Sequence, residues 1–224
     1  MKTSLVDEEI QRIQKLRYYE NGAYQEGYLK IAGIDEVGRG CIAGPVAAAA
    51  VILPRDFFLT GVNDSKLLSE KKRLQMVVDI KREAVAWSVV MISPQHIDQE
   101  NILRATKEAM HTAVNELQPI PDFLLVDAVR IPAINIRQYP IIKGDSLSIS
   151  IACASIIAKV ERDQSMQAYD SIYPGYGFAR HKGYATREHI IALENKGPVP
   201  IHRASFEPVK SILGGSYDQP VLFR

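Results

Sequence analysis

The sequence predicts a mixed α/β domain in which helices pack on a sheet, and three observations support this fold class. Apolar runs typical of strands come early in the chain, and segments of helical periodicity then alternate with further strand-like runs. A hydrophobic content of 46% over 224 residues is sufficient for a packed core. Three of the apolar runs also end in carboxylates, at the strand ends where ligand sites form in such sheets.

The N-terminal half is predicted to combine helices with three strands. Residues 5–28 place apolar side chains three apart, which is typical of a short helix followed by a linker. Strand-like runs at 28–35 and 44–53 are joined by the glycine-rich "EVGRGCIA", so we expect neighbouring antiparallel strands. Helical periodicity over 69–83 precedes an alternating, strand-like run at 84–92.

The C-terminal half is predicted to be mainly helical. Ser93 and Pro94 supply an N-cap followed by a first-turn proline. The short apolar runs "FLLVDA" and "YPIIKGD" are typical of buried strands that end in Asp127 and Asp145. Longer helices are expected at 102–117, 146–174 and 187–196.

Composition excludes several classes of protein. No stretch approaches the roughly 18 apolar residues of a membrane span, and the N-terminus becomes charged where a signal peptide would be apolar, so we expect a cytoplasmic protein that binds no membrane. Cys41 and Cys153 lack the spacing of disulfide frameworks or metal ligands and are expected to be small buried thiols. Because the net charge is only +1, any polyanion site has to be built from local clusters.

Four carboxylates are the strongest functional signal in the chain. Each follows strand-like apolar residues, so packing would bring several acids together at low solvation. They are Asp35, Glu36, Asp127 and Asp145. Like charges at close range raise one another's pKa, and a divalent cation would neutralise them. A pair of Mg²⁺ ions, which prefer oxygen ligands, would stabilise both the attacking and the leaving oxygen of phosphodiester hydrolysis.

Turn chemistry offers a second interpretation of these acids. Aspartates commonly end strands because they favour turns and helix caps, and Asp145, directly before a helix, is the clearest candidate cap. Geometry adds a difficulty, because successive strand residues point to opposite faces. Asp35 and Glu36 can share a metal only if the strand bends or ends there, or if Glu36 contributes its backbone carbonyl. The glycines that follow make a bend plausible.

Basic and aromatic residues are candidate substrate contacts. The Gly-Arg-Gly turn at 38–40 allows close backbone approach and offers a guanidinium to a sugar-phosphate. The loops "NDSK" and "KGDS" place Lys66, Lys143 and Ser146 as candidate phosphate contacts. Aromatic and basic residues alternate over 176–184, a mixture suited to stacking on a sugar or base. Plain turns, solvated loops and core aromatics are the alternative interpretations of these three features.

Together these segments resemble the ribonuclease HII family, the type 2 ribonucleases H. The similar motifs, in the family's order, are "GIDEVGRG" with "AGPV", "NDSK", "LLVDA", "KGDSLSISIACASIIAKVERD" and "YPGYGFARHKGY". The resemblance extends from about Tyr28 to about Pro208. It implies a ribonuclease H-like fold, with a mixed sheet flanked by helices and a helical C-terminal part.

The resemblance also implies roles for individual residues. The catalytic, metal-binding acids would be Asp35, Glu36, Asp127 and Asp145. Gly38, Arg39 and Gly40 would sense the ribonucleotide's 2′-hydroxyl, the group that distinguishes RNA from DNA, and the adjoining phosphate. Tyr184 would stack on the sugar next to the junction and so require DNA on the 3′ side. Many members have proline where this chain has Cys41, a difference that would loosen the turn without removing a ligand.

The activity implied by the resemblance is endonucleolytic cleavage of RNA in RNA–DNA hybrids, including cleavage 5′ of a single ribonucleotide in duplex DNA. With Mg²⁺ or Mn²⁺ the products would be a 3′-hydroxyl and a 5′-phosphate. We expect a monomer that removes ribonucleotides during DNA repair and replication. Two alternatives stay open: another two-metal nuclease on this fold, such as a junction resolvase or DNA endonuclease, and a catalytically silent nucleic-acid-binding module.

Three parts of the chain are expected. They are an N-terminal helical extension over 1–28, a catalytic domain over 29–208 and a C-terminal tail over 209–224. The tail contains Gln219 to Phe223, a Gln-x-x-Leu-Phe sequence that resembles the peptides that dock on bacterial sliding clamps. Because five-residue motifs arise by chance, clamp binding is a hypothesis that needs its own test.

Overall fold

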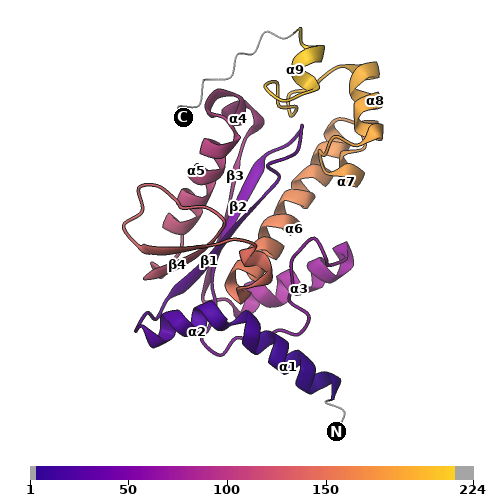
Figure 1. Ribbon diagram of the computed structural model, residues 1–224. Coiled ribbons are helices and arrows are strands. Elements are labelled where there is room, and N and C mark those ends of the chain that lie inside the picture. The colour runs from indigo at the N-terminus through magenta and orange to yellow at the C-terminus, as the bar shows by residue number, and fades with distance from the viewer. Residues whose placement is uncertain (1–3, 215–224) are drawn as a thin grey trace. The chain divides into compact units, whose positions relative to one another are not determined.

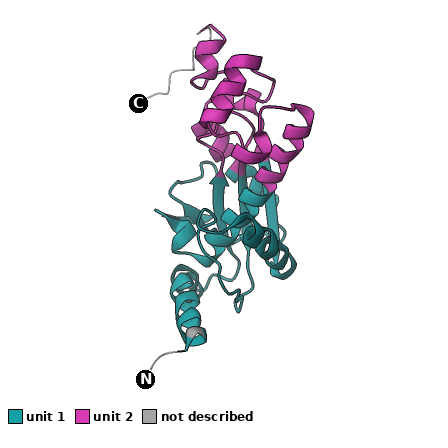
Figure 2. Cartoon of the chain, turned by 90° about the vertical axis from the view of Figure 1, so that its right-hand side faces the viewer, with its two compact units in different colours: residues 1–36, 48–90, 110–160 teal, residues 37–47, 91–109, 161–224 magenta. Residues whose placement is uncertain are grey.

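The computed structural model describes residues 4–214 and divides them into two compact units. Unit 1 comprises the described residues within 1–36, 48–90 and 110–160. Unit 2 comprises those within 37–47, 91–109 and 161–224. Figure 2 shows the units in teal and magenta. Several helices and strands begin in one unit and end in the other, so the units are not consecutive stretches of chain.

The sheet has the strand order β3-β2-β1-β4-β5, and Figure 1 labels the first four of these strands. Its strands are β1 (Ile31–Val37), β2 (Val46–Ile52), β3 (Ala86–Ile92), β4 (Phe123–Asp127) and β5 (Arg137–Ile141). β1, β4 and β5 run parallel to one another. β1 and β2 are neighbours in the sheet, as the sequence predicts for the first two strands. The sheet is mixed and flanked by helices, which confirms the predicted fold class.

Most helices begin where the sequence supplies a cap. The helices are α1 (Leu5–Leu16), α2 (Tyr18–Gln25), α3 (Glu70–Glu83), α4 (Pro94–Glu100), α5 (Ile102–Asn115), η1 (Gly144–Ser146), α6 (Ile149–Ile172), α7 (Phe178–His181), α8 (Arg187–Lys196) and α9 (Val209–Ile212). Ser69, Ser93 and Thr186 each accept a hydrogen bond from a backbone N–H three residues later, which satisfies a helix-end donor. No helix in the described range is long and apolar enough to cross a membrane.

Two predicted elements differ from the structure. The linker expected within 5–28 is a second helix, α2, which buries Ala23 and the carboxyl of Glu20. The strand expected to end at Asp145 ends four residues earlier, at Ile141. Lys143 then takes a left-handed conformation with φ 59° and starts the 3₁₀ turn η1 that contains Asp145. The apolar run therefore includes a turn as well as a strand.

The core of unit 1 brings α2 and the start of α6 onto one face of the sheet. Ile31, Phe123 and Leu125, from neighbouring strands, pack in one buried cluster with Ile151 of α6. Gly33 lies on the same face, directly against the backbone of Ser150, so a Cβ at this position would collide with the helix. This close approach fixes the distance between β1 and α6, which determines where the end of β1 meets the helix.

Unit 2 has its own aromatic core. Tyr176 and Phe178 are buried and stacked, with ring centroids 5.2 Å apart. They pack with Met166 and Ile201 in one cluster. Of the mixed aromatic and basic stretch at 176–184, the first two aromatics thus close the core, whereas Tyr184 is 41% exposed. The interpretation as core aromatics is confirmed for Tyr176 and Phe178 only.

Candidate active site

The strand register places two of the predicted acids side by side. β1 and β4 are parallel, with Ile34 paired to Val126, so the next pair in register is Asp35 and Asp127. Both acids lie on the face of the sheet that α6 covers, because each is an even number of residues from a core residue of that face. Their position follows directly from two apolar strands of matched register.

Glu36 joins them through its side chain. One carboxylate oxygen each from Asp35, Glu36 and Asp127 lies within 4.8 Å of the others. Asp35 turns back toward the following peptide, since the Glu36 N–H donates to its Oδ1 at 2.7 Å. β1 continues to Val37, so the site needs neither a strand end nor a carbonyl ligand at Glu36. We call Asp35, Glu36 and Asp127 the acid trio.

The electrostatics of the acid trio fit a divalent cation. Burial raises the pKa of Asp35 well above its ordinary value, and the charges of Glu36 and Asp127 raise it further, while a hydrogen bond with Ser155 of α6 opposes them. Burial also raises the pKa of Asp127, against a hydrogen bond from the Gly144 N–H at 2.7 Å. Carboxylates held this close repel one another, and a hard cation with oxygen ligands relieves that repulsion.

Asp145 lies near the acid trio but is not one of its members. It is buried in η1, and its charge contributes to the raised pKa of Asp127. Its Oδ2 pairs with the Lys66 Nζ at 3.2 Å. Burial lowers the pKa of Lys66, but the hydrogen bond and charge of Asp145 outweigh it, so the net shift is upward. In the described structure Asp145 is therefore paired with Lys66, which the sequence predicts to contact a phosphate.

The other two predicted phosphate contacts of unit 1 lie beside Asp145. Lys143 and Ser146 flank it and are both exposed. The Ser146 hydroxyl donates to the Lys143 carbonyl at 2.9 Å, which fixes the turn. Gly144 is buried between them, and a Cβ there would meet Ile151 at 2.6 Å. The turn thus presents two polar side chains to solvent on a rigid backbone.

In unit 2 the Gly-Arg-Gly turn is held by a buried arginine. Gly38 takes a φ of 92°, which favours glycine, and its carbonyl accepts from Arg203 Nη2 at 2.7 Å. Arg203 also donates to the carbonyls of Arg39 at 2.9 Å and Gly44 at 3.0 Å. The guanidinium is fully buried, and burial lowers its pKa to about 10, so it stays charged at neutral pH. Arg39 and Gly40 are exposed.

A second buried arginine joins this turn to the segment that contains Tyr184. Arg162 donates to the carbonyls of Ala43 and Pro45, and to that of Lys182 at 2.9 Å. The Cys41 thiol also faces the Lys182 carbonyl, at 3.7 Å. We call residues 38–45 and 182–184 the loop pair. Cys41, the residue at which the chain departs from the motif it resembles, is buried here and links the two loops.

Sequence reasoning missed both arginines. Arg162 carried one detectable signal, because it shares a helical face with Ser155, Ala158 and Met166, all of them buried. A cation on a buried helical face needs several hydrogen-bond acceptors. Nothing local to Arg203 distinguishes it from a surface arginine, since its acceptors lie about 160 residues earlier in the chain.

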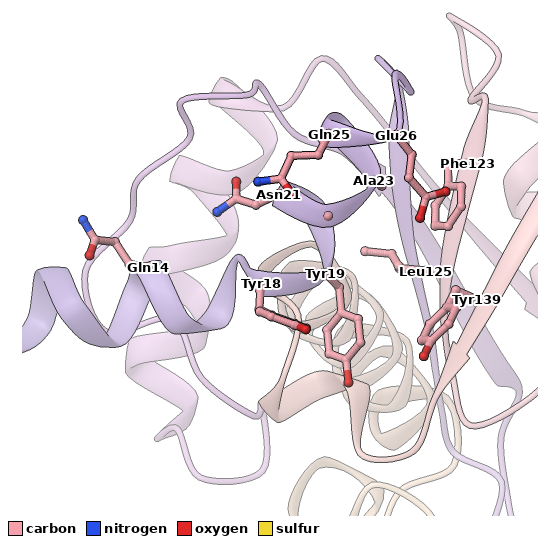
Figure 3. A pocket seen from close by; sticks show the side chains of 11 residues that line it. Gln14, Tyr18, Tyr19, Asn21, Ala23, Gln25, Glu26, Phe123, Leu125 and Tyr139 are labelled. Carbon is pink, nitrogen blue, oxygen red and sulfur yellow. The ribbon is translucent and has the colours of Figure 1, made fainter.

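Unit 1 also has a cavity that none of the predicted site residues line. Figure 3 shows it between α1, α2 and the strands β4 and β5. Its volume is about 460 Å³, and its lining includes Gln14, Tyr18, Tyr19 and Tyr139. It contains no cluster of carboxylates, so the acid trio is the better candidate for catalysis.

Comparisons with known proteins agree with this geometry. The ribonuclease HII family model matches residues 32–209. A ribonuclease HII from Syntrophomonas wolfei is 60% identical over 219 residues, which is 97% of this chain and 86% of that protein. The crystal structure of ribonuclease H2 from Pyrococcus horikoshii superposes with a TM-score of 0.70 at 25% identity, covering 82% of this chain and 97% of that one. A PCNA:RNase HII complex from Archaeoglobus fulgidus gives 0.67 at 26% identity, with coverage of 80% and 96%.

Proposed function

This chain belongs to the ribonuclease HII family, endonucleases that hydrolyse RNA in RNA–DNA hybrids, and we propose that it also cuts 5′ of single ribonucleotides embedded in duplex DNA. The observation that supports phosphodiester hydrolysis is the acid trio, with three carboxylate oxygens within 4.8 Å of one another near the C-terminal ends of two parallel strands. Such a cluster is costly for a fold unless a cation uses it.

The metal would be Mg²⁺ or Mn²⁺, held by Asp35, Glu36 and Asp127, with Asp145 as a fourth catalytic ligand. When bound as a pair, such ions lower the pKa of the attacking water and stabilise the leaving oxygen. The chain's own part is to hold the carboxylates in place: Ser155 and the Glu36 N–H orient Asp35, and the Gly144 N–H orients Asp127. Hydrolysis on the 5′ side of the ribonucleotide would leave a 3′-hydroxyl and a 5′-phosphate.

Substrate choice would rest on the loop pair. Gly38, Arg39 and Gly40 would sense the 2′-hydroxyl and the adjoining phosphate, and Tyr184 would stack on the neighbouring sugar. A rigid backbone supports this role, because reading one hydroxyl requires donors and acceptors in fixed positions. Arg203 and Arg162 supply that rigidity through six hydrogen bonds to backbone carbonyls. Lys66, Lys143 and Ser146 would contact phosphates from unit 1.

The deciding experiment compares a DNA duplex that contains one ribonucleotide with the same duplex made only of DNA. We expect a single cut 5′ of the ribonucleotide, mapped with Mg²⁺ and with Mn²⁺, and no cutting of the control. Equal cutting of both duplexes would instead indicate a junction resolvase or another DNA endonuclease on this fold. Binding without cutting would indicate a catalytically silent module.

We further propose a cytoplasmic monomer that removes ribonucleotides during DNA repair and replication. The clamp-binding peptide proposed at Gln219–Phe223 lies outside the described residues. The Archaeoglobus fulgidus relative forms a complex with PCNA, which supports a test in this chain. Pull-down with a bacterial sliding clamp should capture the full chain and should fail when residues 219–224 are deleted. Equal capture of both would refute the proposed peptide.

A further inference from the structure

Three buried histidines of unit 2 form a cluster, and one of them, His189, contacts the backbone of Tyr184. His181 and His189 stack with ring centroids 4.1 Å apart, and His189 and His202 face each other with their Nε2 atoms 3.1 Å apart. All three are buried, and His189 is fully so. Burial lowers the pKa of His189 and of His202 to about 4, so both are neutral at pH 7.

Backbone groups fix which nitrogen of each ring carries the proton. The His189 Nδ1 lies 2.8 Å from the Tyr184 carbonyl, an acceptor only, so Nδ1 carries the proton and Nε2 is free to accept. His202 Nδ1 lies 2.9 Å from the Val199 N–H and 3.2 Å from the Val199 carbonyl, and because His189 Nε2 can only accept, His202 carries its proton on Nε2, donates to His189 and accepts from the Val199 N–H. The chain of donors therefore runs from Val199 through the two rings to the Tyr184 carbonyl.

The third histidine holds the other side of Tyr184. His181 Nε2 donates to the Tyr176 carbonyl at 2.8 Å, and its Nδ1 accepts from the Gly183 N–H at 3.2 Å. The Tyr184 N–H donates to the His181 carbonyl at 2.9 Å. Gly183 has a φ of 86°, and a Cβ there would collide with the Ala43 carbonyl, so this turn has little freedom to move.

We propose that His189 is a positioning residue for Tyr184, oriented by His202, and that it sets how tightly the enzyme requires DNA on the 3′ side of the ribonucleotide. The inference rests on the proposed role of Tyr184 in stacking on that sugar. The Tyr184 carbonyl also accepts from the Thr186 N–H at 2.8 Å, so the imidazole supplies one of the two hydrogen bonds described on this carbonyl. Without the hydrogen bond from His189, the turn at Tyr184 stays closed through the Thr186 N–H, but the exposed Tyr184 ring has a wider range of orientations.

The test uses a ratio that does not depend on how much of the enzyme is folded. This preference ratio is kcat/KM on the one-ribonucleotide duplex divided by kcat/KM on a hybrid whose cut strand is entirely RNA. His189→Ala should lower it by about fivefold, the effect of one buried hydrogen bond, mainly through a higher KM on the first substrate. Tyr184→Ala should lower it at least as much. In the double variant His189→Ala should add nothing further.

Two amide variants separate positioning from packing. His189→Asn places an N–H near the position of Nδ1 and should restore most of the ratio. His189→Gln is closer in size to histidine but places its amide near Nε2, so the ratio should stay low. An unchanged ratio in His189→Ala, a proportional loss on both substrates, or equal behaviour of the two amides would overturn the inference.

The double variant distinguishes the inference from its premise. If Tyr184→Ala lowers the ratio and His189→Ala does not, the positioning role fails and the proposed function stands. A ratio that Tyr184→Ala leaves unchanged would remove the role of Tyr184 and the inference with it, while ribonucleotide-dependent cutting would still support the acid trio. A further loss on adding His189→Ala to Tyr184→Ala would show that the histidine acts elsewhere.

Discussion

The acid trio of unit 1 and the loop pair of unit 2 are stabilised in opposite ways. The acid trio gathers negative side chains at strand ends, where burial and mutual repulsion raise the pKa of Asp35 and Asp127. In the loop pair, two buried arginines and the neutral imidazole of His189 donate to main-chain carbonyls, so the backbone itself is the organised group. The first region carries a repulsion that a bound cation would relieve, whereas the second is held by hydrogen bonds within the protein.

This difference indicates how the two regions would divide the work. A charged cluster that is unstable by itself is suited to recruit an ion and to act on a phosphate. A backbone fixed by buried donors is suited to discriminate one hydroxyl group, because it does not adjust to the wrong sugar. Changes in the acid trio should therefore remove chemistry and spare stability, and changes in the loop pair should cost stability first.

The largest expected effect is that of Asp127→Asn on hydrolysis. It removes a metal-binding charge from the acid trio and should lower kcat on the one-ribonucleotide duplex by at least about 100-fold, since loss of even an outer-shell partner costs up to that much. Binding should largely survive, because phosphate contacts elsewhere carry it. The melting temperature should hold or rise as repulsion falls. Asp56→Asn, an exposed aspartate, is the matched control and should leave kcat unchanged.

Arg203→Lys should reverse that pattern. Lysine cannot reproduce three divergent hydrogen bonds to Gly38, Arg39 and Gly44, and two lost charge-assisted bonds should lower the free energy of unfolding by about 3 kcal/mol. Urea unfolding measures the loss. Arg104→Lys, in an exposed ion pair between the first turn of α5 and Glu100 at the end of α4, should change it by less than about 0.5 kcal/mol. Similar losses in both variants would mean that the three hydrogen bonds of the buried guanidinium do not stabilise the fold more than an exposed ion pair does.

Gly33→Ala is a change in unit 1 that should damage stability and site together. The new methyl would collide with the Ser150 backbone, and forcing α6 away should cost about 2 kcal/mol. Because α6 also carries Ser155, which hydrogen-bonds Asp35, activity should fall as well. Gly22→Ala in α2, where a Cβ meets nothing within 4 Å, should be neutral or slightly stabilising. Equal effects of the two substitutions would show that β1 and α6 are free to separate.

The sequence predicted the acid trio more completely than the loop pair for a physical reason. Asp35 and Asp127 end apolar runs, and two such runs in parallel register bring their ends together. The same pattern failed for Asp145, because a run that looks continuous contains a left-handed turn at Lys143 that ends the strand. Side-chain geometry lay beyond the pattern too, since only the structure shows the Asp35 carboxylate turned toward the Glu36 N–H.

The loop pair depends on contacts between distant parts of the chain. Its glycines and Tyr184 were recognisable by resemblance, but Arg203 donates to carbonyls about 160 residues earlier in the chain, which no local pattern connects to it. Secondary-structure propensity and hydrophobic periodicity predict local structure from residues that are close in sequence. The role of a buried hydrogen-bond donor instead depends on its acceptors, which can lie far away in the sequence. For this reason the sequence predicted the residues that we propose to meet the substrate and missed those that hold their backbone in place.

The smallest expected effect concerns Glu20, a buried carboxyl of unit 1 that resembles the loop pair in its bonding. Its Oε1 accepts from the Ser150 N–H at 3.0 Å and from the Ser148 hydroxyl at 2.5 Å, while its Oε2 is buried without a hydrogen bond. Burial raises its pKa, against these bonds. A carboxyl whose pKa is raised on folding stabilises the protein most below its unfolded value, and that contribution is lost as pH rises through the folded value.

Glu20→Gln removes this titration but keeps an acceptor for the serines, so the free energy of unfolding of the variant should improve relative to the unsubstituted chain as pH rises from 4 to 8. Urea unfolding at several pH values measures the difference, and Glu116→Gln, an exposed acid, should show no such trend. A difference that shrinks with pH would mean that the ionised carboxylate is the better partner for the start of α6. In that case Glu20 would stabilise unit 1 as a buried charge satisfied by hydrogen bonds, as Arg203 does in unit 2. Within unit 1, destabilising repulsion between charges would then be a property of the acid trio and not of Glu20.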